Sequence, residues 1–286
     1  MMEKQFKRLN SKKLKSLTRE ERIKYFEELR VFYLSLPYNE VEKKRKAQHY
    51  LYIAKKLIFI TDCLYHPQPI NNETHVDRAD GKGFIYVSNH LNSLDQFSLI
   101  SAIGKDKPLV VLVKNTLLKL KRGLLYTYVG CEFIDLNNLK QIKNTFETLA
   151  KDVLHGRDVL IFPEGTRNTT EKLMLDFHVG AVRLAQETGA KIIPYAINED
   201  YRILKHGHLY VRRGDEVFVS PDDDLIEANE KLEETVRTLI WDNMEQERDT
   251  HIHALNEKIK NDAIKRYLKK RNKIEQQRKR INIKNI

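Results

Sequence analysis

Cysteine and long apolar runs are scarce in this sequence of 286 residues. The two cysteines, Cys63 and Cys131, lie far apart and outside any CxxC pair, which excludes a disulfide framework and the common cysteine zinc sites. The longest apolar candidate, YLYIAKKLIFI, is interrupted by Lys55 and Lys56, whereas a membrane-spanning helix needs about 20 apolar residues. The N-terminus, MMEKQFKRLNSKKLKS, has no apolar core of a signal peptide. We therefore expect a chain that does not span a membrane and that lies in the reducing cytoplasm.

Charge is unevenly distributed along the chain, whose formal net charge is +11. Residues 1–60 hold 16 Lys and Arg against 7 Asp and Glu, and residues 251–286 hold 12 against 3. Each flank therefore has a net charge of +9, whereas residues 61–250 have a net charge of −7. Basic flanks suit an anionic surface, either phospholipid headgroups or nucleic acid, and composition alone does not distinguish these two partners. A nucleotide bias toward Lys, Asn and Ile codons is a further explanation for the tail.

Two amphipathic helices are predicted near the N-terminus. Thr18 and Glu21 have the spacing of a capping box, and apolar residues follow at helical spacing until Pro37. Asn39 can cap a second helix, whose apolar stripe continues to Leu64. These stripes either bind lipid or pack on the acidic centre of the chain. A turn-rich stretch, HPQPINNETHVDRADGKG, follows the second helix.

From residue 84 the pattern changes to short runs of β-branched, aromatic and other apolar residues, separated by helical segments. The predicted strands are Phe84–Val87, Leu109–Val113, Glu132–Leu136, Val159–Phe162 and Ile192–Ile197. This alternation predicts an α/β fold with a mixed, largely parallel sheet flanked by helices. The segment YVRRGDEVFVS, residues 210–220, predicts a terminal hairpin. After Pro221 helical spacing returns and continues into a basic C-terminal helix.

His90 falls where the first predicted strand ends, and Asp95 follows five residues later. Ligands of open α/β sheets bind at the carboxyl ends of the strands. On a regular helix, side chains five residues apart point about 140° away from each other, so this pair meets only if His90 precedes the helix. The Asp95 carboxylate can then orient the imidazole as a general base. The simpler alternative is an ordinary helix start, where Asp95 only stabilises the helix N-terminus.

A second candidate motif, VLIFPEGTRNTT, contains the fourth predicted strand and the turn that follows it. Pro163 and Gly165 around Glu164 indicate a tight turn, and the Arg167 guanidinium is suited to a phosphate. Alone, this pattern also fits an ordinary turn with a surface arginine. The sequence has no GxSxG motif and no suitable histidine near either cysteine, so no protein nucleophile is evident. A His and Asp pair without such a nucleophile predicts activation of a substrate hydroxyl.

Together, NHLNSLD at residues 89–95 and FPEGTRN at residues 162–168 resemble the NHxxxxD and FPEGTRS motifs of the glycerolipid acyltransferase family. The best-known members of this family are the 1-acylglycerol-3-phosphate (lysophosphatidate) acyltransferases. The resemblance extends over about residues 80–200 and includes VLVKNTLLKL around Lys114, GCEFID at Gly130–Asp135 and KIIPYAI at Lys191–Ile197. It implies the glycerol-phosphate acyltransferase version of the α/β fold.

The resemblance implies transfer of a fatty acyl group from acyl-CoA or acyl carrier protein to the free hydroxyl of 1-acylglycerol-3-phosphate, which gives phosphatidic acid. It implies no metal ion and no prosthetic group. His90 and Asp95 would form the catalytic pair, with Arg167 on the acceptor phosphate and Pro194 near the acyl group. The residues expected to bind substrates are Lys114, Glu164, Gly165, Thr166, Arg167 and Pro194.

Two positions depart from the family pattern. Leu136 stands where the second block is expected to have an arginine, and His178, in DFHVGA, stands where a lysine is common. Lys114 or Lys140 could replace the missing phosphate contact. The alternative acceptors are therefore another lysophospholipid or glycerol-3-phosphate itself.

These inferences divide the chain into a helical membrane-associating region, residues 1–75, a catalytic domain, residues 76–222, and a helical basic tail, residues 223–286. The basic flanks would hold the protein on the anionic inner face of the cell membrane as a cytoplasmic, peripheral enzyme. The expected partners are the lysophospholipid, the acyl thioester, the membrane surface and, as one possible donor, acyl carrier protein; nucleic acid is not expected. A non-catalytic protein that binds anionic surfaces is the remaining alternative.

Overall fold

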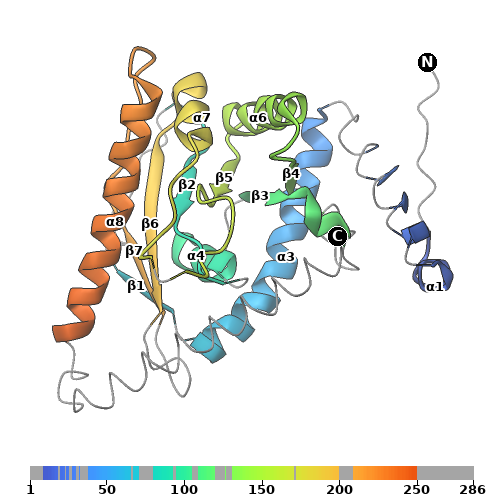
Figure 1. Cartoon of the computed structure of the whole chain (residues 1–286), viewed down its shortest axis with the longest axis horizontal. Helices are drawn as coiled ribbons and strands as arrows, with labels where there is room; N and C mark the ends of the chain where they lie inside the picture. The colour runs from blue at the N-terminus through green and yellow to red at the C-terminus, as the bar shows by residue number, and fades with distance from the viewer. Residues whose placement is uncertain are drawn as a thin grey trace.

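The computed structural model describes residues 9–18, 38–65, 67–70, 80–92, 95–104, 109–119, 131–170, 172–199 and 209–249, together with residues 20–22, 24, 25, 28, 29, 32 and 126. In this part of the chain, a seven-stranded sheet lies at the centre with helices on both faces (Figure 1). The predicted fold class, α/β with a mixed, largely parallel sheet flanked by helices, is confirmed.

The order of strands across the sheet is β1-β7-β6-β2-β5-β3-β4. The parallel strands are β2 (Ile85–Ser88), β3 (Leu109–Lys114), β4 (Glu132–Ile134), β5 (Asp158–Ile161) and β6 (Ile192–Glu199). β7 (Leu209–Arg213) is antiparallel to β6, and β1 (Pro67–Ile70) is parallel to β7 at the edge of the sheet. Each of the five strands predicted from the sequence is present within two residues of its expected bounds.

Two parts of the sheet differ from the prediction. β1 lies in the stretch that was predicted to be rich in turns, and it contains Pro67 and Pro69. An edge strand tolerates proline, since one side of it has no strand to accept its N–H groups. The predicted hairpin at residues 210–220 is wrong. β7 pairs with β6, and Val217 forms an isolated antiparallel bridge with Ile192 of β6, so both arms bond to β6 instead of to each other.

Helices cover both faces of the sheet and bury an apolar core on each (Figure 1). α3 (Glu40–Tyr65) and α4 (Asp95–Ile103) pack on one face, while α6 (Leu139–Leu154), α7 (Gly180–Thr188) and α8 (Leu225–Asp249) pack on the other. β2 is buried along its whole length because it is covered on both faces. β1 is the edge strand of this sheet and α8 packs against the sheet, so residues on both sides of 76–222 contribute to it.

The N-terminal segment contains α1 (Ser11–Ser16), which the sequence did not predict. The capping box after α1 is present: Thr18 N donates to Glu21 Oε2 at 2.7 Å, and Glu21 N donates to Thr18 Oγ1 at 3.2 Å. Tyr25 and Leu29 are buried against apolar side chains from α1 and its flanks. Much of the first predicted helix lies outside the described residues.

The second predicted helix is confirmed as α3, and Asn39 caps it by accepting a hydrogen bond from Glu42 N at 3.0 Å. Ile58 of α3 is buried in the same apolar core as α4, and Ile53 packs against that core. The apolar stripe of α3 therefore packs at least in part on the sheet. No helix within the described ranges is both long and apolar enough to span a bilayer. The predicted basic helix at residues 251–286 lies outside the described residues.

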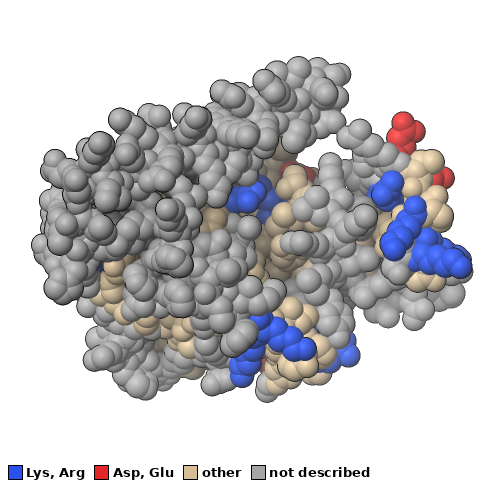
Figure 2. Space-filling view, turned by 90° about the horizontal axis from the view of Figure 1, so that it is seen from below, with Lys and Arg blue, Asp and Glu red and all other residues tan. Residues whose placement is uncertain are grey.

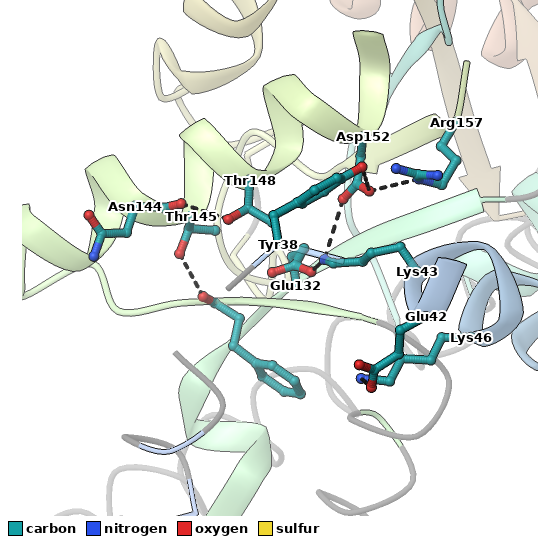
Figure 3. A network of polar contacts seen from close by, with 11 residues as sticks. Tyr38, Glu42, Lys43, Lys46, Glu132, Asn144, Thr145, Thr148, Asp152 and Arg157 are labelled. Carbon is teal, nitrogen blue, oxygen red and sulfur yellow. Dashed lines mark hydrogen bonds and ion pairs between the residues drawn. The ribbon is translucent and has the colours of Figure 1, made fainter. Parts of the chain in front are cut away.

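Buried and partly buried charged side chains join the start of α3 to α6 and to the sheet (Figure 3). Lys43 forms ion pairs with Glu132 at the start of β4 and with Asp152 of α6. Asp152 Oδ1 accepts hydrogen bonds from Arg157 Nε at 2.7 Å and from the Tyr38 hydroxyl at 3.3 Å. Burial raises the pKa of Asp152 to about 6 and lowers the pKa of Lys43, so desolvation of both charges outweighs their attraction.

Candidate active site

The carboxyl ends of β2, β5 and β3 meet at one edge of the sheet, because these strands are parallel neighbours. His90 follows β2 by two residues, Pro163–Arg167 follow β5, and Lys114 ends β3. The Asn89 side chain fixes the start of the first of these loops: its amide donates to Ile197 O and accepts from Ile197 N, both at 2.8 Å. The two motifs that the sequence singled out therefore lie side by side.

His90 and Asp95 are in direct contact. His90 Nδ1 lies 2.8 Å from Asp95 Oδ2, and Asp95 is the first residue of α4, so the histidine precedes the helix as the predicted contact requires. The same carboxylate oxygen accepts hydrogen bonds from Leu91 N at 2.6 Å and from Asn92 N at 2.8 Å. Asp95 is fully buried, whereas His90 is partly exposed. Asp95 therefore fixes both the loop and the ring, and leaves Nε2 as the ring nitrogen available to a substrate.

The loop after β5 holds His90 from the other side. The imidazole stacks on Phe162, with ring centroids 4.2 Å apart and planes inclined by 21°. His90 O accepts a hydrogen bond from Asn168 N at 2.7 Å, and His90 N donates to Glu164 Oε1 at 2.6 Å. The ring is therefore positioned before any substrate binds, as general base catalysis requires.

Glu164 differs from its expected place among the substrate contacts. Its side chain is only 3% exposed and does not line the cavity described below. Oε1 accepts from His90 N, and Oε2 accepts from Leu175 N at 2.7 Å. Two backbone N–H groups thus occupy the carboxylate, so Glu164 joins the two loops and positions His90.

Gly165, Thr166 and Arg167 complete the turn and line the cavity. Gly165 has φ of +61° and donates its N–H to Phe162 O at 2.9 Å. A Cβ at Gly165 would lie 3.1 Å from His178 Cδ2, so both the conformation and the close approach of that ring favour glycine here. The exposed Arg167 side chain belongs to the same cavity wall.

The cavity has a volume of about 1550 Å³ and is lined by His90, Lys114 and the turn after β5. Lys114 is partly buried, which lowers its pKa. No ion pair of Lys114 occurs within the described part of the chain. Apolar side chains line much of the rest of the cavity: Val111, Val113, Leu117, Tyr126, Ile142 and Phe146. One end of the cavity thus contains the imidazole of His90 and the cations Lys114 and Arg167, and it adjoins an apolar compartment.

Two further residues singled out from the sequence lie away from the cavity wall. Pro194 is buried in β6, where it pairs with Val87 of β2, and is not among the described residues that line the cavity. Lys140 is exposed on α6, and its neighbour along the helix, Lys143, lines the cavity instead. The structure therefore does not bring Pro194 or Lys140 to the site.

Sequence reasoning missed several residues of the cavity wall. Leu136 and His178 were noted only as departures from a motif, and Lys143 and Arg183 were not singled out at all. Lys143 and Arg183 lie on the polar faces of α6 and α7, where sequence does not distinguish a cavity wall from an ordinary solvent-facing side. Among the described residues, no group of three or more His, Cys, Asp or Glu side chains is arranged to bind a metal ion.

The part of the sequence that forms this site matches a known protein family. Residues 68–198 match the family model described as Acyltransferase. A probable 1-acyl-sn-glycerol-3-phosphate acyltransferase of Mycoplasma genitalium is 29% identical over 192 residues, which cover 61% of this chain and 66% of that protein. The 1-acyl-sn-glycerol-3-phosphate acyltransferase of Haemophilus influenzae is 34% identical over 111 residues, covering 38% of this chain and 45% of that protein. The match thus spans less than two thirds of either relative.

A solved structure shares the fold. The crystal structure of the 1-acyl-sn-glycerophosphate (LPA) acyltransferase of Thermotoga maritima aligns with a TM-score of 0.55 and 19% identity, covering 79% of this chain and 98% of that one. The matched residues 68–198 include both motifs, the His90–Asp95 contact and the turn after β5. Residues 68–198 therefore form a domain of the acyltransferase family, with similarity to these 1-acyl-sn-glycerol-3-phosphate acyltransferases.

Proposed function

We propose that this protein transfers a fatty acyl group from an acyl thioester to the free hydroxyl of 1-acylglycerol-3-phosphate, which gives phosphatidic acid. The observation that carries the proposal is the 2.8 Å contact between His90 and Asp95 beside a cavity that also contains Arg167 and Lys114. A general base next to two cations matches an acceptor that has both a hydroxyl group and a phosphate. The names of the relatives from Mycoplasma and Haemophilus support the same acceptor.

The proposed mechanism uses His90 as the general base. Asp95 keeps the proton of the neutral imidazole on Nδ1, so Nε2 can take the proton of the acceptor hydroxyl while its oxygen attacks the thioester carbonyl carbon. Asp95 stabilises the imidazolium that results. Collapse of the tetrahedral intermediate breaks the C–S bond, and the departing thiolate takes the proton back from His90 Nε2. No acyl-enzyme forms, and base catalysis of this kind contributes roughly 10²–10⁴-fold in rate.

The cavity offers separate places for the two ends of the acceptor. Arg167 and Lys114 provide positive charge for the phosphate, and an arginine fork can bind two phosphate oxygens at once. The apolar part of the wall suits acyl chains, because each buried methylene contributes about 0.8 kcal/mol. Acyl-CoA and acyl carrier protein present the same thioester, so both are donors under this mechanism. It draws on protein side chains alone, and we propose that it needs no metal ion or prosthetic group.

The acceptor resides in a bilayer, so the protein is proposed to bind the membrane surface peripherally, on the anionic cytoplasmic face. Basic side chains predominate among the described charged residues on the face shown in Figure 2. α1 contributes the exposed residues Lys12, Lys13 and Lys15. A basic residue near an anionic bilayer contributes about 1 kcal/mol. This charge supports attraction to anionic lipid without a spanning helix.

Release of free thiol from palmitoyl-CoA by the purified protein, measured with and without 1-acylglycerol-3-phosphate, tests the proposal. The expected result is release that depends on the acceptor and equals the phosphatidic acid formed. Palmitoyl-acyl carrier protein in place of palmitoyl-CoA identifies the donor. Glycerol-3-phosphate and lysophosphatidylcholine test the alternative acceptors that Leu136 makes relevant. Absence of acceptor-dependent release with every pair of substrates would overturn the proposed function.

A further inference from the structure

Leu136 and His178 both approach Gly165. A Cβ built at Gly165 would be 3.6 Å from Leu136 Cδ1 and 3.2 Å from His178 Nε2, so both side chains reach the same point. His178 N also donates to Pro163 O at 2.9 Å, which ties the segment before α7 to the turn after β5. The residue that replaces the expected arginine and the residue that replaces the common lysine are therefore spatial neighbours.

Of these two side chains, only His178 can donate a hydrogen bond to an anion. Its ring is exposed, lines the cavity and packs on the glycine two residues before Arg167. Within the described ranges, the His178 ring has no hydrogen-bond or ion-pair partner. Leu136, 40% exposed in the same wall, offers only apolar contact.

We propose that His178 binds the phosphate of the acceptor together with Arg167, and thereby makes the affinity for the acceptor depend on pH. The inference rests on the proposed function and concerns acceptors with a phosphate monoester headgroup. Histidine exchanges its charge between about pH 5 and 8. An imidazolium forms a charge-assisted hydrogen bond to phosphate, and a neutral imidazole forms a weaker one.

Other charged groups of the cavity also influence how the affinity for the acceptor depends on pH. Besides His90, the charged side chains of the described wall are Lys114, Lys143, Glu147, Arg167, Arg183 and Glu187. A phosphate monoester itself loses its second proton near about pH 6. The pH dependence of the wild type therefore contains contributions from the substrate, and a matched variant is needed to isolate His178.

The test measures kcat and the acceptor KM at pH 6 and pH 8 for the wild type, His178→Ala and His178→Lys, at saturating palmitoyl-CoA. His178→Ala is expected to raise KM about tenfold at pH 6, which corresponds to loss of one charged hydrogen bond, and much less at pH 8, with kcat unchanged. His178→Lys should keep the wild-type KM at pH 6 and lower it relative to the wild type at pH 8. The substrate titrates identically with all three proteins, so this difference belongs to His178.

Leu136→Arg provides an independent check. Because Leu136 shares the point over Gly165, an arginine there should restore the acceptor KM of His178→Ala at both pH values. Equal KM for the wild type and His178→Ala at pH 6, or a loss confined to kcat, would overturn the inference while leaving the proposed function intact. Absence of acceptor-dependent turnover in the wild type would overturn the proposed function itself, and the inference with it.

Discussion

Glu164 Oε1 accepts a hydrogen bond from the backbone N–H of His90 at 2.6 Å and so joins the loop after β5 to the loop after β2. Its second oxygen accepts from Leu175 N at 2.7 Å. The glutamate of the FPEGTR turn is therefore a positioning residue for the proposed base. The two motifs form one unit because a residue of one fixes the backbone of the other.

Glu164→Gln is expected to lower kcat about tenfold and to leave the acceptor KM within about twofold. The amide oxygen can replace one carboxylate oxygen, but the amide NH₂ then faces a partly buried backbone N–H, which costs about 1–3 kcal/mol and displaces His90. Steady-state kinetics with varied acceptor separate the two parameters. Glu187→Gln, an exposed carboxylate of the same cavity wall, serves as the control and should be neutral. A raised KM with unchanged kcat would instead make Glu164 a substrate ligand.

Local sequence patterns were sufficient to predict five strands and the approach of His90 to Asp95. β2 and β5 are short, fully buried runs at the centre of the sheet, and such runs are recognisable without tertiary information. β1 was missed because its two prolines indicate turns, and only its position at the sheet edge permits them.

The parts of the site that could not be predicted depend on contacts between distant segments. Glu164 and His90 are separated by 74 residues, and nothing in a single sequence shows that a motif glutamate faces backbone N–H groups and not the cavity. The approach of Leu136 and His178 over Gly165 likewise exists only once β4, β5 and α7 have assembled. The sequence therefore singled out Glu164, Leu136 and His178 without showing these contacts.

Lys43→Met is expected to reduce the free energy of unfolding by about 3 kcal/mol, because it leaves the buried Asp152 and the partly buried Glu132 without their lysine partner. The matched control is Lys46→Met, three residues further along the same helix, where the ion pair with Glu42 lies near the surface and contributes about 0.5 kcal/mol. Urea unfolding of both variants measures the difference. Equal losses would show that the buried cluster of Figure 3 does not anchor α3.

Asp152→Asn is expected to cost more stability at pH 4 than at pH 7. Burial raises the pKa of Asp152 from 3.8 to about 6, so between these values the folded protein binds a proton that the unfolded chain releases. The wild type therefore loses stability through this group as pH rises from about 4 to 6, and the asparagine variant does not. Urea unfolding at pH 4, 5, 6 and 7 measures the difference. A cost that grows with pH would mean that Lys43 and Arg157 stabilise the carboxylate more than burial penalises it.

Replacing Lys12, Lys13 and Lys15 of α1 with glutamate is expected to weaken binding to vesicles of phosphatidylglycerol and phosphatidylcholine by at least tenfold. Three exposed lysines each contribute about 1 kcal/mol if they approach the surface. Sedimentation with vesicles measures the binding, and pure phosphatidylcholine vesicles are the control. Unchanged binding to the anionic vesicles would place the membrane contact elsewhere, and stronger binding of the wild type to duplex DNA than to these vesicles would favour the nucleic-acid alternative.

The most direct test of the central claim measures phosphatidic acid formed from palmitoyl-CoA and 1-acylglycerol-3-phosphate by the wild type, His90→Ala and His49→Ala. His49 is exposed on α3, with its Nδ1 3.0 Å from the carbonyl oxygen of Arg45, and is the matched control. We expect a loss of at least about 10²-fold in His90→Ala, no loss in His49→Ala, and the same circular dichroism for all three. Wild-type turnover by a folded His90→Ala protein would contradict the assignment of His90 as the base.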